Sequence, residues 1–323
     1  MEAYGGCWLK MKFRNIGQII FGILTFIPGV YSWRAKKLGS GGSYSSRYCY
    51  SVWMRHIVLA NNCNLGIRPK IVAELGPGDS LGIGIMSLLL GAEKYYAFDV
   101  VPFASSKKNL NIMRELLVMV NNREPIPGDK EFPRIRPKLE DYSFPFDIYS
   151  EDYLSKCLTK SRIKNIHDSI NLNKKMIEYV APWNNDLNIK HNFVDMIVSQ
   201  AVLEHIDDLD NAYEKMKMWL KDDGFMSHCV DFKSHGYSDS WDGHWNIPDW
   251  LWKLIRGNRP YLINREPYST HERIINDCGF KMLESINVYL PSSCSKSKLS
   301  KRFIYMKKED RVTSGACIVL VKG

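Results

Sequence analysis

The stretch 71–82, IVAELGPGDSLG, joins two apolar runs through three glycines. Its first five residues are typical of a buried strand, and residues 80–90 of a helix that Gly91 closes. Glycine has no Cβ, so Gly76 and Gly78 let the chain turn with positive φ and approach a ligand closely. The loop also presents free N–H groups of the following helix, which suits a nucleotide or a carboxylate.

Outside this turn, predicted strands and helices alternate from Lys70 onward, which is typical of an α/β protein with a doubly wound, Rossmann-like sheet of seven strands. The predicted strands are Ile71–Leu75, Lys94–Val101, Met176–Trp183, Phe193–Leu203, 225–232, 280–290 and 316–323. The predicted helices are 80–90, 104–122 and one that Asp207 or Asp208 opens and Gly224 stops. Ligands of such sheets bind at the carboxyl ends of the strands.

Two parts of the chain depart from this alternation, so we expect a helical extension over residues 1–66 and a main domain over 67–323 with an inserted substrate cap. Residues 123–175 are rich in proline and too long for a crossover loop, which indicates an insertion. Residues 291–312 form a basic loop, which is either a solvated surface or a contact for anionic lipid or a pyrophosphate carrier.

The apolar run Ile19–Val30 has basic residues on both sides. It is shorter than the ~20 residues of a membrane-spanning helix, and no signal-peptide cleavage site follows. The alternatives are a helix buried on the main domain, a peripheral membrane contact lying in the interface, or a wall of an apolar substrate pocket.

The net charge of +9 favours anionic partners. Basic residues are dispersed and not interleaved with evenly spaced aromatics, so nucleic acid is not an expected partner. The eight cysteines contain no C-x-x-C pair, and we expect reduced thiols in a cytoplasmic protein, with the inner face of the membrane as an alternative location. A homodimer is left open.

Two acids accompany the glycine turn. Glu74 precedes it, and Asp99 ends the second strand, where an acid can accept hydrogen bonds from both hydroxyls of a ribose. The spacing G-x-G-x-x-x-G is not the dinucleotide fingerprint, and Glu74 would repel a pyrophosphate. The pair therefore favours a nucleoside ligand that carries a positive end.

This constellation resembles the class I S-adenosylmethionine-dependent methyltransferases. Their E-x-G-x-G motif matches 74–78, their ribose acid matches Asp99, and their fourth-strand motif matches VDMIVSQAVLEHIDD at 194–208. The resemblance implies S-adenosylmethionine as cofactor. The cofactor contacts that it implies are Glu74, Gly76, Pro77, Gly78, Asp99, Val100, Pro182, Trp183 and Gln200.

Two residues are the candidates for catalysis, His205 and Asp231. His205 follows the fourth strand, where related O-methyltransferases place a general base, and an oxygen nucleophile must lose its proton at some stage. The alternative is a histidine that caps a helix or holds a loop. Glu204 is expected to fix backbone or His205 and not to react.

The segment 228–245, HCVDFKSHGYSDSWDGHW, carries a second polar cluster after the fifth strand. Carboxylates and imidazoles bind sugar hydroxyls well. The residues predicted to contact substrate are His228, His235, His244 and Trp245. The spacing is irregular and has no H-x-x-x-H pair, so no metal site is predicted.

Segments before and after the core, GSGGSYSSRYCYSVWMRH and HWNIPDWLWKLIRGN, are similar to bacterial methyltransferases of surface-polysaccharide biosynthesis. This resemblance implies methylation of a sugar hydroxyl in a glycan or activated-sugar precursor. The alternatives are a lipid or quinone-like acceptor and a non-catalytic cofactor-binding protein. The N-P-P-Y-type motif for methylating an amide or base nitrogen is absent, because strand four ends in SQAV.

Overall fold

The computed structural model describes residues 13–28, 43–172, 175–183, 190–259 and 261–323. Its centre is a seven-stranded sheet in the order β3-β2-β1-β4-β5-β7-β6. The strands are β1 Ile71–Leu75, β2 Lys94–Phe98, β3 Ile177–Val180, β4 Val194–Gln200, β5 Leu220–Asp231, β6 Phe280–Tyr289 and β7 Thr313–Lys322. The first five run parallel, and β7 pairs antiparallel with both β5 and β6. The predicted Rossmann-like sheet is therefore confirmed.

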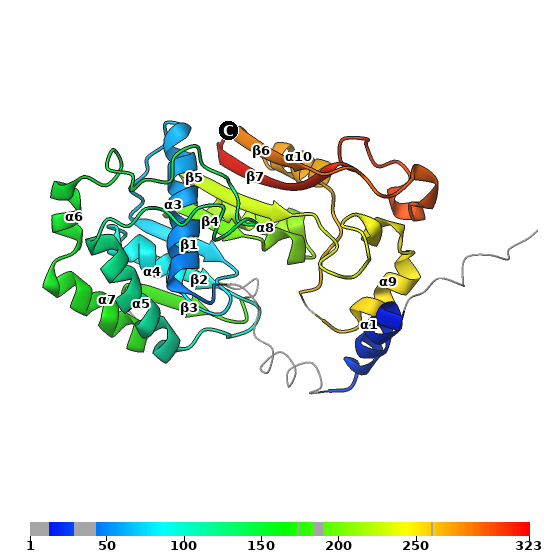
Figure 1. Ribbon diagram of the computed structural model, residues 1–323, viewed down its shortest axis with the longest axis horizontal. Coiled ribbons are helices and arrows are strands. Elements are labelled where there is room, and N and C mark those ends of the chain that lie inside the picture. Colours follow the sequence, from blue (N-terminus) through cyan, green and yellow to red (C-terminus); the bar gives the residue numbers. More distant parts are fainter. Residues whose placement is uncertain (1–12, 29–42, 173–174, 184–189, 260) are drawn as a thin grey trace, which may run out of the picture.

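Helices cover both faces of the sheet (Figure 1). Their bounds are α1 Phe13–Leu24, α3 Ser46–Asn62, α4 Gly82–Leu89, α5 Ser106–Asn121, α6 Glu151–Cys157, α7 Lys160–Leu172, α8 Leu209–Trp219, α9 Asp249–Arg256 and α10 Tyr268–Asp277. Because side chains alternate along a strand, Val72 packs into the apolar cluster beneath α3, α4 and α5, and Ala73 into the cluster beneath α8 and α10. The glycine turn between β1 and α4 is thus held between two packed layers.

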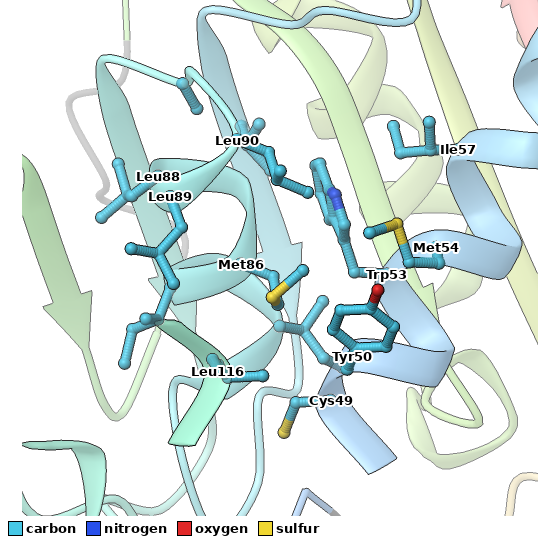
Figure 2. Packing of buried hydrophobic residues seen from close by; sticks show 14 of the residues in the cluster. Cys49, Tyr50, Trp53, Met54, Ile57, Met86, Leu88, Leu89, Leu90 and Leu116 are labelled. Carbon is cyan, nitrogen blue, oxygen red and sulfur yellow. The ribbon is translucent and has the colours of Figure 1, made fainter. Parts of the chain in front are cut away.

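Helix α3 is part of the main core. Ser45 caps it, since its side chain accepts a hydrogen bond from the Tyr48 N–H at 3.2 Å. Figure 2 shows Trp53 and Met54 of α3 beside Leu90 and Met86 at α4. The buried side of α3, which includes Tyr50, Trp53, Met54 and Ile57, fastens this part of the chain to the sheet.

The predicted end of α8 at Gly224 is wrong. Asp208 caps the helix as expected, with its side chain accepting from the Asn211 N–H, but the helix ends at Trp219. Leu220 already has extended backbone and pairs with Val194 of β4. Burial of Leu220 in the sheet favours the extended backbone, and Asp222, Asp223 and Gly224 have low helix propensity.

The predicted insertion at 123–175 packs against the face that carries α3. Ile126, Phe144 and Tyr149 belong to the same apolar cluster as α3 and α4. The buried guanidinium of Arg55 on α3 donates to the Pro137 carbonyl at 2.7 Å. These contacts make the described part of the segment a structural layer on the core.

The expectation that all cysteines are free thiols is wrong for two of them. Cys229 on β5 and Cys317 on β7 face each other in the antiparallel register and form a disulfide. They lie 88 positions apart in the sequence, so their pairing depends on the strand order and has no local sequence signal. Cys49, Cys63, Cys157, Cys278 and Cys294 are free.

Helices α1 and α9 lie side by side at the end of the molecule remote from α6 (Figure 1). Their close approach requires Gly22, because a Cβ there would lie 2.0 Å from the Leu254 carbonyl oxygen. Thr25 strengthens the contact, since its hydroxyl accepts from the Asn258 N–H at 2.8 Å. In the part of the chain that the structure describes, no helix has the length and apolarity needed to cross a bilayer.

Candidate active site

A cavity of about 470 Å³ opens at the carboxyl ends of β1, β2 and β4. Its lining comes from the glycine turn, from the loops after β2, β4 and β5, and from α1 and the segment after α9. The residues that line it include Phe21, Glu74, Gly76, Pro77, Gly78, Asp99, Val100, Trp183, Gln200, His205, His235, Tyr237, Arg259 and Tyr261. No described residue of 123–172 lines it, so its cover comes from α1 and from residues 235–263.

The glycine turn has the predicted backbone. Gly76 and Gly78 have φ of 63° and 72°, a region that other residues rarely adopt. A Cβ at Gly76 would lie 2.6 Å from the side chain of Val202. Ser43 steadies the turn from outside, because its hydroxyl accepts from the Ser80 N–H at 2.9 Å. The turn is therefore preformed, with backbone facing the cavity.

Asp99 lies next to this turn, as predicted from the end of the second strand. Its carboxylate accepts from the Gly78 N–H at 3.0 Å and from the Val100 N–H at 2.7 Å. Burial raises its pKa to about 6, although these backbone donors act in the opposite direction. The arrangement can present a carboxylate edge to a pair of hydroxyls.

Glu74 lines the same end of the cavity and is buried. The Tyr95 hydroxyl donates to its carboxylate at 2.5 Å. Burial raises the pKa of Glu74 to about 8, and the tyrosine opposes part of this rise. The protonated acid of the free protein can therefore ionise when a positive group binds beside it.

The aromatic wall of this end is built from two strands. Trp183 lies 6.2 Å from Phe98 between ring centroids, and its backbone N–H donates to the Asp99 carbonyl at 2.8 Å. Pro182 is exposed and does not line the cavity, which corrects its predicted role. Gln200 lines the cavity and is held from behind by the buried His56 at 3.0 Å.

His205 lies at the other end of the cavity, on the short 3-10 turn Leu203–His205. Its Nδ1 donates to the Tyr261 carbonyl at 2.9 Å, which leaves the Nε2 lone pair available. Asn264 clamps the same turn by donating to the Leu203 and Ile206 carbonyls at 2.9 and 2.7 Å. Burial lowers the pKa of His205 to about 4, and His235 adds to the shift.

Glu204, His205 and His235 meet at this end, and each offers a donor atom within 4.8 Å of the others. The His235 Nε2 lies 4.0 Å from a Glu204 oxygen and 3.6 Å from an Asp231 oxygen. Asp231 also accepts from the Lys233 ammonium at 2.9 Å. Burial and the nearby Asp231 hold the pKa of Glu204 well above its usual range. Burial acts to raise the pKa of Asp231, but His235 and Lys233 lower it by more, so the pKa lies below its usual value.

Three predicted substrate residues lie elsewhere, which corrects their assignment. His228 is fully buried inside the sheet and bonds the Ser199 hydroxyl at 2.8 Å. His244 is buried against Trp245, whose indole N–H donates to the Arg265 carbonyl at 2.9 Å. Since none of the three lines the cavity, only His235 of the predicted substrate residues remains there.

Further cavity residues come from the apolar run 19–30, for which a pocket wall was one of the alternatives, and from the segments around α9. Tyr237, Tyr261 and Phe21 line the half of the cavity that contains His205. Arg259 also lines it, with its guanidinium 5.2 Å from the Phe21 ring. These residues come from α1 and from the loops around α9, and no spacing in the chain signals that they converge.

Comparison with protein families matches residues 141–227 to a model described as a methyltransferase domain. A search of curated proteins finds no match. Among solved structures, an S-adenosylmethionine-dependent methyltransferase from Mesorhizobium loti is 11% identical, with 78% of this chain and 90% of that chain covered and a TM-score of 0.38. The YcgJ protein from Bacillus subtilis is 8% identical, with 82% and 96% covered and a TM-score of 0.40.

The matched segment contains β3, β4 and α8 and ends within β5, so the glycine turn lies outside it. The fold, the turn and the matched domain define the protein as an S-adenosylmethionine-dependent methyltransferase, whose cofactor is S-adenosylmethionine.

Proposed function

We propose that the protein methylates a hydroxyl of a sugar in a glycan or activated-sugar precursor. The observation that carries the proposal is the mixed lining of the cavity beyond the glycine turn. Histidine, tyrosine and arginine side chains share that half with a few apolar ones. An all-apolar tunnel would favour a lipid or quinone-like acceptor, whereas aromatic faces and polar groups together suit a sugar ring.

We assign the cofactor contacts to the other end of the cavity, where the glycine turn and Asp99 support them. The ribose hydroxyls bind Asp99, the methionine part lies along Gly76 to Gly78, and Glu74 faces the positive end of the cofactor. Trp183 packs beside the adenine. This orientation directs the methyl group toward His205, where the acceptor would lie for in-line displacement at the sulfonium.

His205 acts on the acceptor in this proposal, and Asp231, which does not line the cavity, acts through His235. The free Nε2 of His205 accepts the proton of the acceptor hydroxyl as the oxygen attacks the methyl carbon. Asp231 orients His235, whose Nε2 lies 3.6 Å away. S-adenosylhomocysteine leaves when the S–CH₃ bond breaks.

The protein would meet its acceptor at the cytoplasmic face of a membrane. The exposed outer face of α1 and α9 supports this location, with Ile16, Ile20 and Ile23 of α1 and Trp250 of α9 each between 41% and 53% exposed. Exposed apolar residues at these spacings form one stripe of a helix that can lie in a bilayer interface. Lys10, Lys12, Arg34, Lys36 and Lys37, which flank this helix in the sequence, lie outside the described residues. Homodimer formation stays a prediction.

The test is incubation with methyl-labelled S-adenosylmethionine and a fractionated extract of cell-envelope precursors. Label in the water-soluble sugar fraction, or in the head group of a lipid-linked sugar, would support the proposal. Label in lipid without sugar would instead assign the lipid acceptor. Cofactor binding without transfer to any fraction would favour the non-catalytic alternative.

A further inference from the structure

We propose that Glu204, His205 and His235 bind a divalent transition-metal cation, with Zn²⁺ the best match, at the acceptor end of the cavity. This inference deepens the proposed function, on which its catalytic part rests. The first observation is the convergence of the three donor atoms within 4.8 Å. Two imidazole nitrogens and one carboxylate form a donor set of catalytic zinc sites, in which a fourth position stays open.

The second observation is the state of the Glu204 side chain. It is 3% exposed, and neither carboxylate oxygen has a hydrogen-bond partner among the described residues. A buried carboxylate without a partner is costly, and a cation in contact with it removes that cost.

The third observation is the orientation of His205. Its Nδ1–H donates to the Tyr261 carbonyl at 2.9 Å, so Nε2 points its lone pair toward the cluster. Histidines that bind metals usually donate their other ring N–H in this manner, which fixes the tautomer and the ring. Asn264 holds the turn itself through two backbone carbonyls.

Charge and distance are consistent with an ion of this kind. The His235 Nε2 lies within 4.0 Å of oxygens of both Glu204 and Asp231, and Lys233 forms an ion pair with Asp231. Tetrahedral ligands about 2.1 Å from zinc lie roughly 3.4 Å apart. The 4.0 Å between Glu204 and His235 therefore needs to shorten by about half an ångström. His235 lies on the loop after β5 with φ of 46°, a conformation that persists where the surroundings impose it.

With the cation bound, His205 holds the metal and no longer receives the proton. An acceptor hydroxyl in the open position loses its proton to water more readily, because the cation stabilises the oxyanion. That oxygen forms the O–CH₃ bond as the S–CH₃ bond of the cofactor breaks.

The test uses the full chain after chelator treatment and dialysis, titrated separately with Zn²⁺, Mn²⁺ and Mg²⁺ by calorimetry, with metal content measured after gel filtration. We expect saturable Zn²⁺ binding with one ion per chain, and weaker binding of Mg²⁺. Loss of an outer partner of a metal site costs about 10- to 100-fold in affinity, so His235→Ala should cost at least about 100-fold. Glu204→Gln is the second site variant, and His167→Ala, on the exposed part of α7, is the matched control.

Cofactor binding is measured on the same samples, so that the two proposals can fail separately. Wild-type protein that binds S-adenosylmethionine but no cation would overturn the metal site and leave the methyltransferase intact. Equal Zn²⁺ affinity in wild type, His235→Ala and Glu204→Gln would also overturn it, since the ion would then bind elsewhere. Cation binding without cofactor binding would instead overturn the proposed function.

Discussion

The substitution Asp99→Asn should weaken cofactor binding and at the same time stabilise the free protein. The carboxylate is 6% exposed, and burial raises its pKa from the usual 3.8 to about 6. The folded protein therefore binds this proton more tightly than the unfolded chain does. Stability falls as pH rises from about 4 through 6, because Asp99 must then ionise in a buried place.

The two magnitudes follow from this geometry. The rise in pKa corresponds to about 3 kcal/mol of unfolding free energy lost at pH 8. An amide cannot accept from both the Gly78 and Val100 N–H groups, so the lost hydrogen bond lowers the unfolding free energy of the variant by about 1–2 kcal/mol. We expect the unfolding free energy of Asp99→Asn to exceed that of wild type by about 1–2 kcal/mol at pH 8. Below pH 4, where Asp99 of wild type is protonated, we expect no such increase. Loss of a charged acceptor for the ribose should weaken S-adenosylmethionine binding by about 2–3 kcal/mol, or roughly 30- to 150-fold.

Chemical denaturation at pH 4 and pH 8 measures the first effect, and calorimetry with S-adenosylmethionine the second. Asp222→Asn is the control, because that carboxylate is 82% exposed and lies far along the sheet edge beside Lys322. A variant that is less stable than wild type at pH 8 would refute the electrostatic reasoning. A variant that binds the cofactor as tightly as wild type would refute the assignment of Asp99 to the ribose.

Four further outcomes test other parts of the site. Gly76→Ala should abolish cofactor binding and cost about 1–2 kcal/mol or more of stability, measured by denaturation, because its φ is positive and its Cβ would meet a side chain. His205→Ala should lower turnover on an identified acceptor and leave cofactor affinity unchanged; unchanged turnover would make the residue structural. Cofactor binding at pH 7 should release a proton from Glu74, because the pKa of this acid is about 8 in the free protein. The calorimetric binding enthalpy of wild type should therefore vary with the ionisation enthalpy of the buffer, and that of Glu74→Gln should not. Ile23→Glu should reduce sedimentation with anionic vesicles, while Val118→Glu, an exposed site on α5, should not.

Much of the sheet could be predicted from the sequence, because its signals are local. The positions of β1, β2, β4 and β5 follow from apolar runs that glycine or acidic residues interrupt. The glycine turn and Asp99 adjoin them in the chain, so the cofactor end of the site could also be predicted. The residues at this end lie within a few positions of a strand end, where glycine and acidic residues give local signals in the sequence.

The acceptor end could not be predicted in the same way. His205 and His235 belong to loops after different strands, and Tyr261 reaches them only because residues after α9 fold back over the sheet. His228 and His244 were predicted as substrate contacts because histidine suits that role. Both side chains are instead buried in the packed interior. Whether such a histidine lines the cavity or lies in the core depends on the direction of its side chain within a strand or a tight turn. The residue type alone does not give that direction.

Hydrogen-bond partners distinguish two buried groups near the cavity, His56 and Glu204. His56 is as deeply buried as any group near the cavity, yet both ring nitrogens are bonded, to Ser227 at 2.6 Å and to Gln200 at 3.0 Å. Burial lowers its pKa to about 4, although the bond to Gln200 opposes this shift, and the two bonds make His56 a satisfied polar link between α3 and the sheet. Glu204 has the same burial and no such partner. Because an unpartnered buried carboxylate costs folding free energy, its presence beside two imidazoles is explained best by a ligand that supplies the missing charge.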